Sequence, residues 1–591
     1  MTRRPLQSSH EECTQHCLTI VNADRDLDMV DEVIATVPCT VSTQAYDMLL
    51  RTVGKHVDKL PTSFSLPAQR TMSRYLSRYF KGFYPHLPFL HLPSTSSDTM
   101  SPLLLLTLCA IGAFYGYEHP QGYALYLASN SIVTEALEQR RRDLVVPLTT
   151  NYPRYAELPT ANPRGLHTDS HIISPHSSVL SSNKDLEILQ ALVVLAQLTS
   201  WVDSPLLQDS LLLTSQLVGL VRDSRGETNW GSKDLELDWH KWHRQEEKRR
   251  TLYAAYIVTN LQTLCFDVPP AIPNSSIHIP LPCSAAEWKA TNATSWQQAR
   301  RTGASQNSTF QQCLRQLLRG QPLDKEVSIT AFGNYVLIHG LLQQLYFERQ
   351  GLFCLTSSSP SLPPDLVRSY AAALRAWQSS WDMTSESTLD PASPYGPLGF
   401  NSTALVRLAH IRLSVGLAAQ CDLTCRDPET LAQPFASAEL LFPLQCSHLE
   451  QAILQCIYAL RIPVRVGIAF VARTQTGQWS VQHAISNFAC ALLLTRWLEN
   501  MSRLVEASSM ESLEESQKRL ILMITHLIEE THLADSLGAE DDDPVRIRRL
   551  AVAAVRLWAE TFKGIQVFEI VHTIGETLSF VAELLEKRNA R

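Results

Sequence analysis

The stretch Arg74–Tyr117 constrains the fold of this chain most, because it places two helices around a rigid proline corner. Around its start, apolar side chains recur at three- and four-residue steps, which is typical of one face of a helix: Met72, Leu76, Tyr79, Phe80 and Phe83. We expect Pro67 to be the first residue of this helix, since the N–H that proline lacks would be unpaired there. Three prolines then prevent the helix from continuing, because each lacks an amide donor and disfavours helical backbone before it: Pro85, Pro88 and Pro93.

A second helix is expected after the proline corner. Ser101 has the hydroxyl of an N-cap, and Pro102 suits the first helical position. Leu103–Tyr115 is apolar nearly all round, which indicates a helix buried inside a protein. Apolar spacings of three and four residues recur along the chain, and Asn-Gly or Asp-Gly hairpin signals between alternating runs are lacking. The sequence therefore predicts an all-α fold.

A further characteristic stretch begins at Trp239 and runs into the apolar segment LYAAYIVTNLQTLCF. Glu246 lies three residues before Arg249 and four before Arg250, which is the spacing of neighbours on a helix surface. An intrahelical ion pair is expected, and it would be worth roughly 0.3–0.5 kcal/mol if it were exposed.

Three groups of residues invite an enzymatic interpretation, but none has the partners that the chemistry needs. Glu246 with His240 or His243 lacks a matching nucleophile or metal set. Cys283 lacks a Cys-His signature and is interpreted as a packed thiol. The acidic run Glu540–Asp543 lacks the carboxylates that the metal motif of terpene cyclases needs one turn later, and it suits a helix N-terminus.

The chain also lacks a P-loop, a GxSxG elbow, a dinucleotide fingerprint and an HExxH pair. We therefore assign no catalytic, cofactor-binding or metal-ligating residue, and a helical enzyme such as a cyclase or hydrolase ranks last among the functions considered.

Residues 1–65 form a polar segment in which no zinc finger is recognisable. Four ligand types cluster there: His10, Cys13, His16 and Cys17. A classical finger needs about a dozen residues between its cysteine pair and its histidine pair, and these four lie too close together. Six cysteines packed into a short basic segment, as in a binuclear cluster, are also absent. We expect no cofactor, and zinc only if fingers are encoded upstream of this chain.

Several ordered segments resemble the fungal-specific transcription factor domain, the all-helical middle homology region of fungal regulators. These are RYLSRYFKGFYPHLPFLHLP followed by SPLLLLTLCAIGAFYGY, the Trp-Glu-Arg-Thr helix, residues 461–500, and the closing AVRLWAETFKGIQVFEIVHTIGETLSFVAELLEK. The branch whose regulators carry Cys2His2 fingers is the most similar. The resemblance covers residues 66–585 and implies a large single helical domain, with an insertion-like loop at 147–182 and polar loops at 355–364 and 383–397.

The resemblance implies a nuclear transcription regulator of RNA polymerase II genes, with a clustered metabolic pathway as one class of target. Expected partners are the transcription machinery or a DNA-binding partner, and a homodimer is compatible with the family. Members of the family bind DNA, but this chain shows no matching DNA-binding motif. We therefore assign DNA binding to none of its residues. A partner-dependent regulator, or a truncated one without its own DNA-binding module, remains open as the alternative.

The composition predicts a globular chain that does not bind nucleic acid through its bulk charge. Hydrophobic residues make up 45% and charged residues 18%, and the net charge is −7. Of the two longest basic clusters, Lys248–Arg250 lies within the helix expected after Trp239. Arg140–Arg142 could serve in nuclear import, but is interpreted as the solvated C-terminus of a helix over Gly122–Leu144.

The cysteine pattern and the N-terminus favour an intracellular, soluble protein. The thirteen cysteines are scattered without a close framework, and polar residues rather than an apolar core follow Met1. No apolar run reaches the length that a bilayer requires. We therefore expect reduced thiols and no membrane association.

Overall fold

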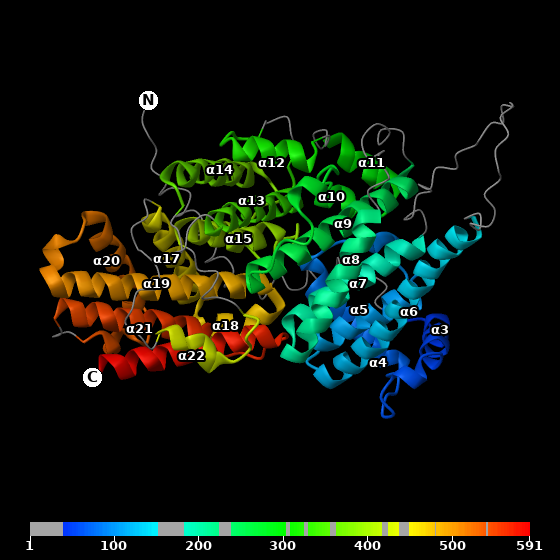
Figure 1. The fold of residues 1–591 in the computed structure, drawn as a ribbon, viewed down its shortest axis with the longest axis horizontal. Coiled ribbons are helices and arrows are strands. Elements are labelled where there is room, and N and C mark those ends of the chain that lie inside the picture. The colour runs from blue at the N-terminus through cyan, green and yellow to red at the C-terminus, as the bar shows by residue number, and fades with distance from the viewer. Residues whose placement is uncertain are drawn as a thin grey trace, which may run out of the picture.

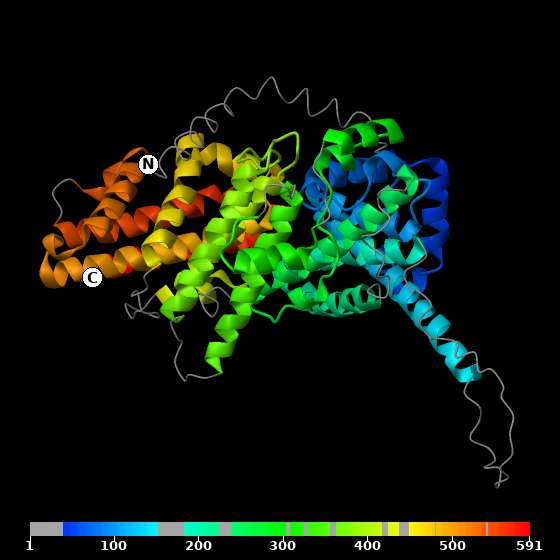
Figure 2. The same ribbon diagram turned by 90° about the horizontal axis from the view of Figure 1, so that it is seen from above.

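The protein is built from helices packed in an elongated body (Figures 1 and 2). The computed structural model describes residues 40–151, 183–223, 238–302, 308–323, 329–354, 362–415, 423–435, 448–478, 480–538 and 542–590. Over these residues the structure contains no β-strand, only an isolated bridge between Pro280 and Thr309. The prediction of an all-α fold is therefore confirmed.

The first helices lie at one end of the body and the last at the other, with α12 to α15 between them (Figure 1). The first half comprises α3 (Thr43–Gly54), α4 (Gln69–Arg78), α5 (Pro102–Tyr115), α6 (His119–Asn151), α7 (Asn183–Trp201), α8 (Leu207–Asp223), α9 (Trp239–Phe266), α10 (Ala285–Trp288), α11 (Ala293–Thr302), α12 (Phe310–Leu318) and α13 (Ala331–Phe353). The second half comprises α14 (Pro364–Met383), α15 (Leu398–Ser414), α16 (Pro428–Ala432), α17 (Leu449–Val466), α18 (Ile468–Gln478), α19 (Val481–Ser508), α20 (Glu515–Glu529), α21 (Asp543–Thr561) and α22 (Glu569–Asn589).

Helix boundaries follow the capping signals in part. Ser101 caps α5 as predicted, because its hydroxyl accepts the N–H of Leu104 at 3.2 Å. Pro67 is not the first residue of α4, which begins at Gln69 with Ala68 in the cap position.

The helix that contains Arg140–Arg142 is longer than the sequence predicts. α6 continues through Pro147 to Asn151, so these arginines do not lie at its C-terminus, and a dipole at that end does not explain them. Arg140 instead forms ion pairs with Asp223, at 2.9 Å, and with Asp185, at 3.6 Å. The predicted insertion-like loop from 147 lies, beyond Asn151, outside the described residues until α7 begins.

The apolar helix α5 is the centre of the first half. Leu103–Phe114 is buried throughout, and α5 packs against α4, α6 and α7. A helix that is buried on every side must be apolar on every side, which is the pattern that the sequence shows. Gly112 marks the closest approach, because a Cβ atom built there would lie 2.0 Å from the carbonyl oxygen of Tyr75 on α4.

Replacing Gly112 by alanine is expected to destabilise the protein by about 3 kcal/mol, because the backbones of α4 and α5 would have to separate. Gly219 on α8 is the matched control, since a Cβ atom built there has no atom of the described residues within 4 Å. Gly219→Ala is expected to stabilise the protein by roughly 0.5–1 kcal/mol. Urea unfolding of both variants measures the difference, and equal midpoints would contradict this account of the contact.

None of the helices in the described parts of the chain is, by itself, long and apolar enough to cross a membrane. Leu449–Val466 and Ile468–Thr474 would pass that test only as a pair, and they are bent by 92° relative to each other.

Candidate functional site

A buried ion-pair cluster forms around Glu246 on α9. Arg249 Nη1 lies 2.5 Å from Glu246 Oε2, and Arg250 Nε lies 2.9 Å from Oε1. The backbone N–H of Cys283 also donates to Oε1, at 2.9 Å. Burial alone would raise the pKa of Glu246, but the charges of Arg249 and Arg250 and the Cys283 N–H hold it below its usual value. The predicted intrahelical pair is thus present, but it is a buried ion pair and not an exposed one.

Arg250 connects this cluster to the proline corner. Its Nη2 donates to the carbonyl oxygen of Cys283 at 2.9 Å, and its Nη1 donates to that of Pro88 at 3.3 Å. The guanidinium also lies 4.3 Å from the ring centre of Trp288, whose Nε1 donates to the hydroxyl of Tyr84 at 3.2 Å. One arginine therefore joins three segments that are far apart in the sequence, which makes the cluster a structural anchor.

The residues that invited an enzymatic interpretation either belong to this structural anchor or do not contact Glu246. None of the contacts described for the Glu246 carboxylate involves His240 or His243. His240 is exposed, whereas His243 is buried and stacks on His91 with ring centres 4.7 Å apart. Burial raises the pKa of the Cys283 thiol well above its usual value, so this side chain is a protonated thiol and a weak nucleophile at neutral pH.

The structure describes only some of the residues for which metal binding was considered. His10, Cys13, His16 and Cys17 lie outside the described residues, as do Glu540 and Asp541. Asp542 and Asp543 lie at the start of α21, with Pro544 in its first turn. Within the described parts of the chain, no three or more His, Cys, Asp or Glu side chains are grouped so that they could hold a metal ion.

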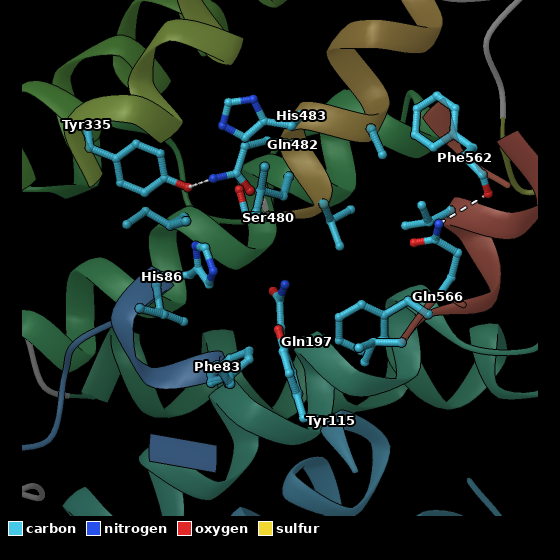
Figure 3. A pocket seen from close by; sticks show the side chains of 18 residues that line it. Phe83, His86, Tyr115, Gln197, Tyr335, Ser480, Gln482, His483, Phe562 and Gln566 are labelled. Carbon is cyan, nitrogen blue, oxygen red and sulfur yellow. Dashed lines mark hydrogen bonds between the residues drawn. The ribbon is translucent and has the colours of Figure 1, made fainter. Parts of the chain in front are cut away.

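A cavity lies where the first helices meet the last ones, and sequence reasoning did not find it (Figure 3). The volume open to the centres of water molecules is about 60 Å³, and the whole empty space, mouth included, is about 750 Å³. Its walls come from the proline corner, α5, α7, α9 and α13 on one side, and from α19, the end of α21 and the start of α22 on the other: Phe83, His86, Leu87, Tyr115, Gln197, Ile257, Leu261, Tyr335, Ser480, Val481, Gln482, His483, Ala484, Phe562, Gln566, Val567, Phe568 and Val571.

Most polar groups in the cavity wall have a protein partner. Gln482 Nε2 donates to the hydroxyl of Tyr335 at 2.9 Å, and the Ser480 hydroxyl donates to Asn401 Oδ1 at 3.1 Å. Gln197 on α7 differs, because its Oε1 is buried without a hydrogen-bond partner within the described structure. Figure 3 shows its amide directed into the empty space. A buried amide group left unpaired costs about 1–3 kcal/mol, so this position needs a water molecule or a ligand.

The two histidines in the wall are neutral at physiological pH. Burial lowers the pKa of His86 to about 4 and that of His483 well below its usual value, and the charge of Arg407 adds to the effect on His483. Asn401 Nδ2 lies 3.2 Å from His86 Nδ1. Because Asn401 Oδ1 accepts from Ser480, its Nδ2 donates to His86, and the neutral ring carries its proton on Nε2.

The cavity could hardly be found from sequence, because its residues lie between positions 83 and 571 on elements that only the fold brings together. One local signal exists. Gln197 interrupts the apolar run ALVVLAQL of α7, and a polar side chain on an otherwise buried helix needs a partner.

Two family models match the chain. The model described as fungal specific transcription factor domain matches residues 76–358, and the model described as fungal transcription factor C-terminal domain matches residues 416–580. The chain therefore belongs to the fungal-specific transcription factor family. Every residue of the cavity wall lies in one of the two matched segments, with those up to Tyr335 in the first and those from Ser480 in the second.

Curated relatives agree with this class. A protein named "Transcription factor" from Gibberella fujikuroi is 24% identical over 337 residues, which are 55% of this chain and 40% of the relative. Transcription factor PfmaH from Pestalotiopsis fici is 26% identical over 153 residues, which are 24% of this chain and 16% of the relative. Zinc finger protein klf1 from Schizosaccharomyces pombe is 21% identical over 268 residues, which are 43% of this chain and 29% of the relative. The match thus spans less than half the length of each relative. No solved structure matches the chain.

Proposed function

We propose that this chain regulates a set of RNA polymerase II genes in the nucleus, such as those of a clustered metabolic pathway, through its helical body. In this proposal the described part of the chain works with a partner or an attached DNA-binding element and does not read a DNA sequence itself. The family match over both halves supports the regulatory role.

The contacts of the basic residues support the proposal that the described part of the chain does not read a DNA sequence itself. Sequence-specific binding needs an element that reaches base edges, together with basic side chains on phosphates. Of the two longest basic clusters, Lys248–Arg250 lies in the buried anchor, where Arg249 and Arg250 pair with Glu246. In the other cluster, Arg140 pairs with Asp223 and Asp185, which leaves Arg141 and Arg142 as its exposed members. The net charge of the whole chain, −7, disfavours binding to the negatively charged DNA backbone.

Two measurements test the proposal. Deleting the gene is expected to change the transcript levels of a set of genes, measured by RNA sequencing, and restoring the gene is the control. The purified chain is expected to give only weak, salt-sensitive and sequence-independent binding to DNA in fluorescence anisotropy. The double variant Arg141→Ala, Arg142→Ala should weaken this residual binding equally for all sequences. Unchanged transcripts would refute the regulatory role, and nanomolar binding to one sequence over scrambled competitor at physiological salt would refute the claim about DNA.

A further inference from the structure

We propose that the cavity between the two matched segments binds an uncharged, ring-containing small molecule that carries a hydroxyl or amide group, and that Gln197 is its principal polar contact. This inference goes beyond the proposed function, because binding to the cavity can be measured without any effect on transcription.

Gln197 provides the first argument. Gln197 is only 8% exposed, and its Oε1 has no hydrogen-bond partner within the described structure. Other polar groups in the wall, such as Gln482 and Ser480, already bond to protein atoms. A primary amide both accepts and donates, so a ligand hydroxyl or amide can satisfy it. We therefore expect a ligand in the cavity to form a hydrogen bond with the side-chain amide of Gln197.

The lining sets the chemical class. Aromatic rings such as Phe83, Tyr115 and Phe568 stand around the cavity together with aliphatic side chains, and among the described residues no lysine, arginine, aspartate or glutamate lines it. Burying an ion without a counter-charge is costly, so a charged ligand is disfavoured. Apolar walls with a few polar groups are typical of sites for small molecules. The volume open to the centres of water molecules, about 60 Å³, exceeds the roughly 10–15 Å³ that one water molecule needs, so the cavity can admit a small molecule.

The position of the cavity gives the expected consequence of binding. A ligand inside would touch α7 and the proline corner on one side and α19 and α22 on the other, so it would contact both matched segments at once. A ligand that binds the packed form stabilises the packing that creates its site. We expect occupancy to tighten the contact between the two segments.

The test uses the full chain and four probes: phenol, benzamide and 4-hydroxyacetophenone, which are uncharged at pH 7, and benzoate, which is a charged analogue of benzamide. Saturation-transfer NMR at millimolar probe concentration detects binding, and the thermal midpoint detects stabilisation. At least one uncharged probe is expected to bind and to raise the midpoint, whereas benzoate is expected to bind at least tenfold more weakly.

Two variants and one control locate the site. Gln197→Leu is expected to weaken binding of the uncharged probe about tenfold while keeping the helix apolar. Val571→Trp is expected to narrow the cavity from α22 and to abolish binding with Gln197 intact. Gln344→Leu on α13, outside the cavity wall, should leave binding unchanged.

The inference would be overturned if none of the three uncharged probes bound, if benzoate bound as well as benzamide, or if neither cavity variant weakened binding. If Gln197→Leu proved too unstable to purify, Val571→Trp alone would decide whether the probe occupies this cavity.

Discussion

Acidification from pH 6.5 to about 5 is expected to unfold this protein cooperatively. Burial lowers the pKa of six histidines to about 4 or below: His86, His91, His243, His339, His410 and His448. It also lowers the pKa of a seventh, His483, well below its usual value. Four of the seven are at most 5% exposed: His91, His243, His339 and His483. These side chains are held in the fold as neutral rings.

The sign of the effect follows from proton linkage. Below pH 6.5 the unfolded chain protonates these histidines and the folded chain does not, so the unfolded state binds more protons and stability falls as the pH falls. Glu247 acts in the opposite direction, because burial raises its pKa to about 7 and the folded state takes up its proton first. Glu287 acts in the same direction as Glu247, because burial raises its pKa too. Four deeply buried histidines against two carboxyls leave a net loss of stability of about 3 kcal/mol per pH unit, which is a large part of the stability of a typical domain.

Far-UV circular dichroism and tryptophan fluorescence between pH 8 and 4 measure this transition. His339→Leu should move the acid midpoint downward, because both ring nitrogens of His339 are buried without a hydrogen bond to any described residue and the variant removes one titrating group. His532→Gln is the control, since that side chain is 59% exposed. A native signal that persists to pH 4 would contradict the assignment of these histidines as buried neutral groups.

Loss of Glu246 is expected to be among the most destabilising single changes in the chain. Glu246→Ala would leave Arg250 buried without its carboxylate, and the Cys283 N–H without its acceptor. Removing one partner of a buried ion pair costs about 3–5 kcal/mol. The unfolding midpoint in urea should therefore fall strongly, and the loss should be visible as reduced soluble yield.

Two further variants separate the contributions. Glu246→Gln keeps the size of the side chain and an acceptor for Cys283, so its effect should be smaller than that of Glu246→Ala and should report the charge alone. Asp365→Ala removes the acid of the Asp365–Arg368 pair on α14, which has similar spacing but side chains 87% and 74% exposed. That variant should be indistinguishable from the parent chain. Equal losses of stability for Glu246→Ala and Asp365→Ala would show that burial does not determine how much an ion pair contributes to stability.

Local signals in the sequence determined the class of the fold and several helix ends. The spacing of apolar residues indicated helices, and Ser101 with Pro102 correctly marked the start of α5, because capping depends on atoms within one helical turn. The same kind of reasoning failed at Pro67, since α4 begins at Gln69, and at Leu144, since α6 continues through Pro147 to Asn151. The family was recognised from ordered segments of sequence, and the family models agree with that recognition.

Only the tertiary structure decided what the polar residues do. The spacing of Glu246, Arg249 and Arg250 predicted a pair on one helix, but not that packing against the proline corner would remove it from water and change its energetic role. The cavity is a stronger case, since Gln197 and Val571 belong to segments that come together only when the two halves pack. Helix formation depends on near neighbours in the chain, whereas burial, pKa values and cavities depend on distant ones, so the sequence alone determined the helices and the packing determined the site.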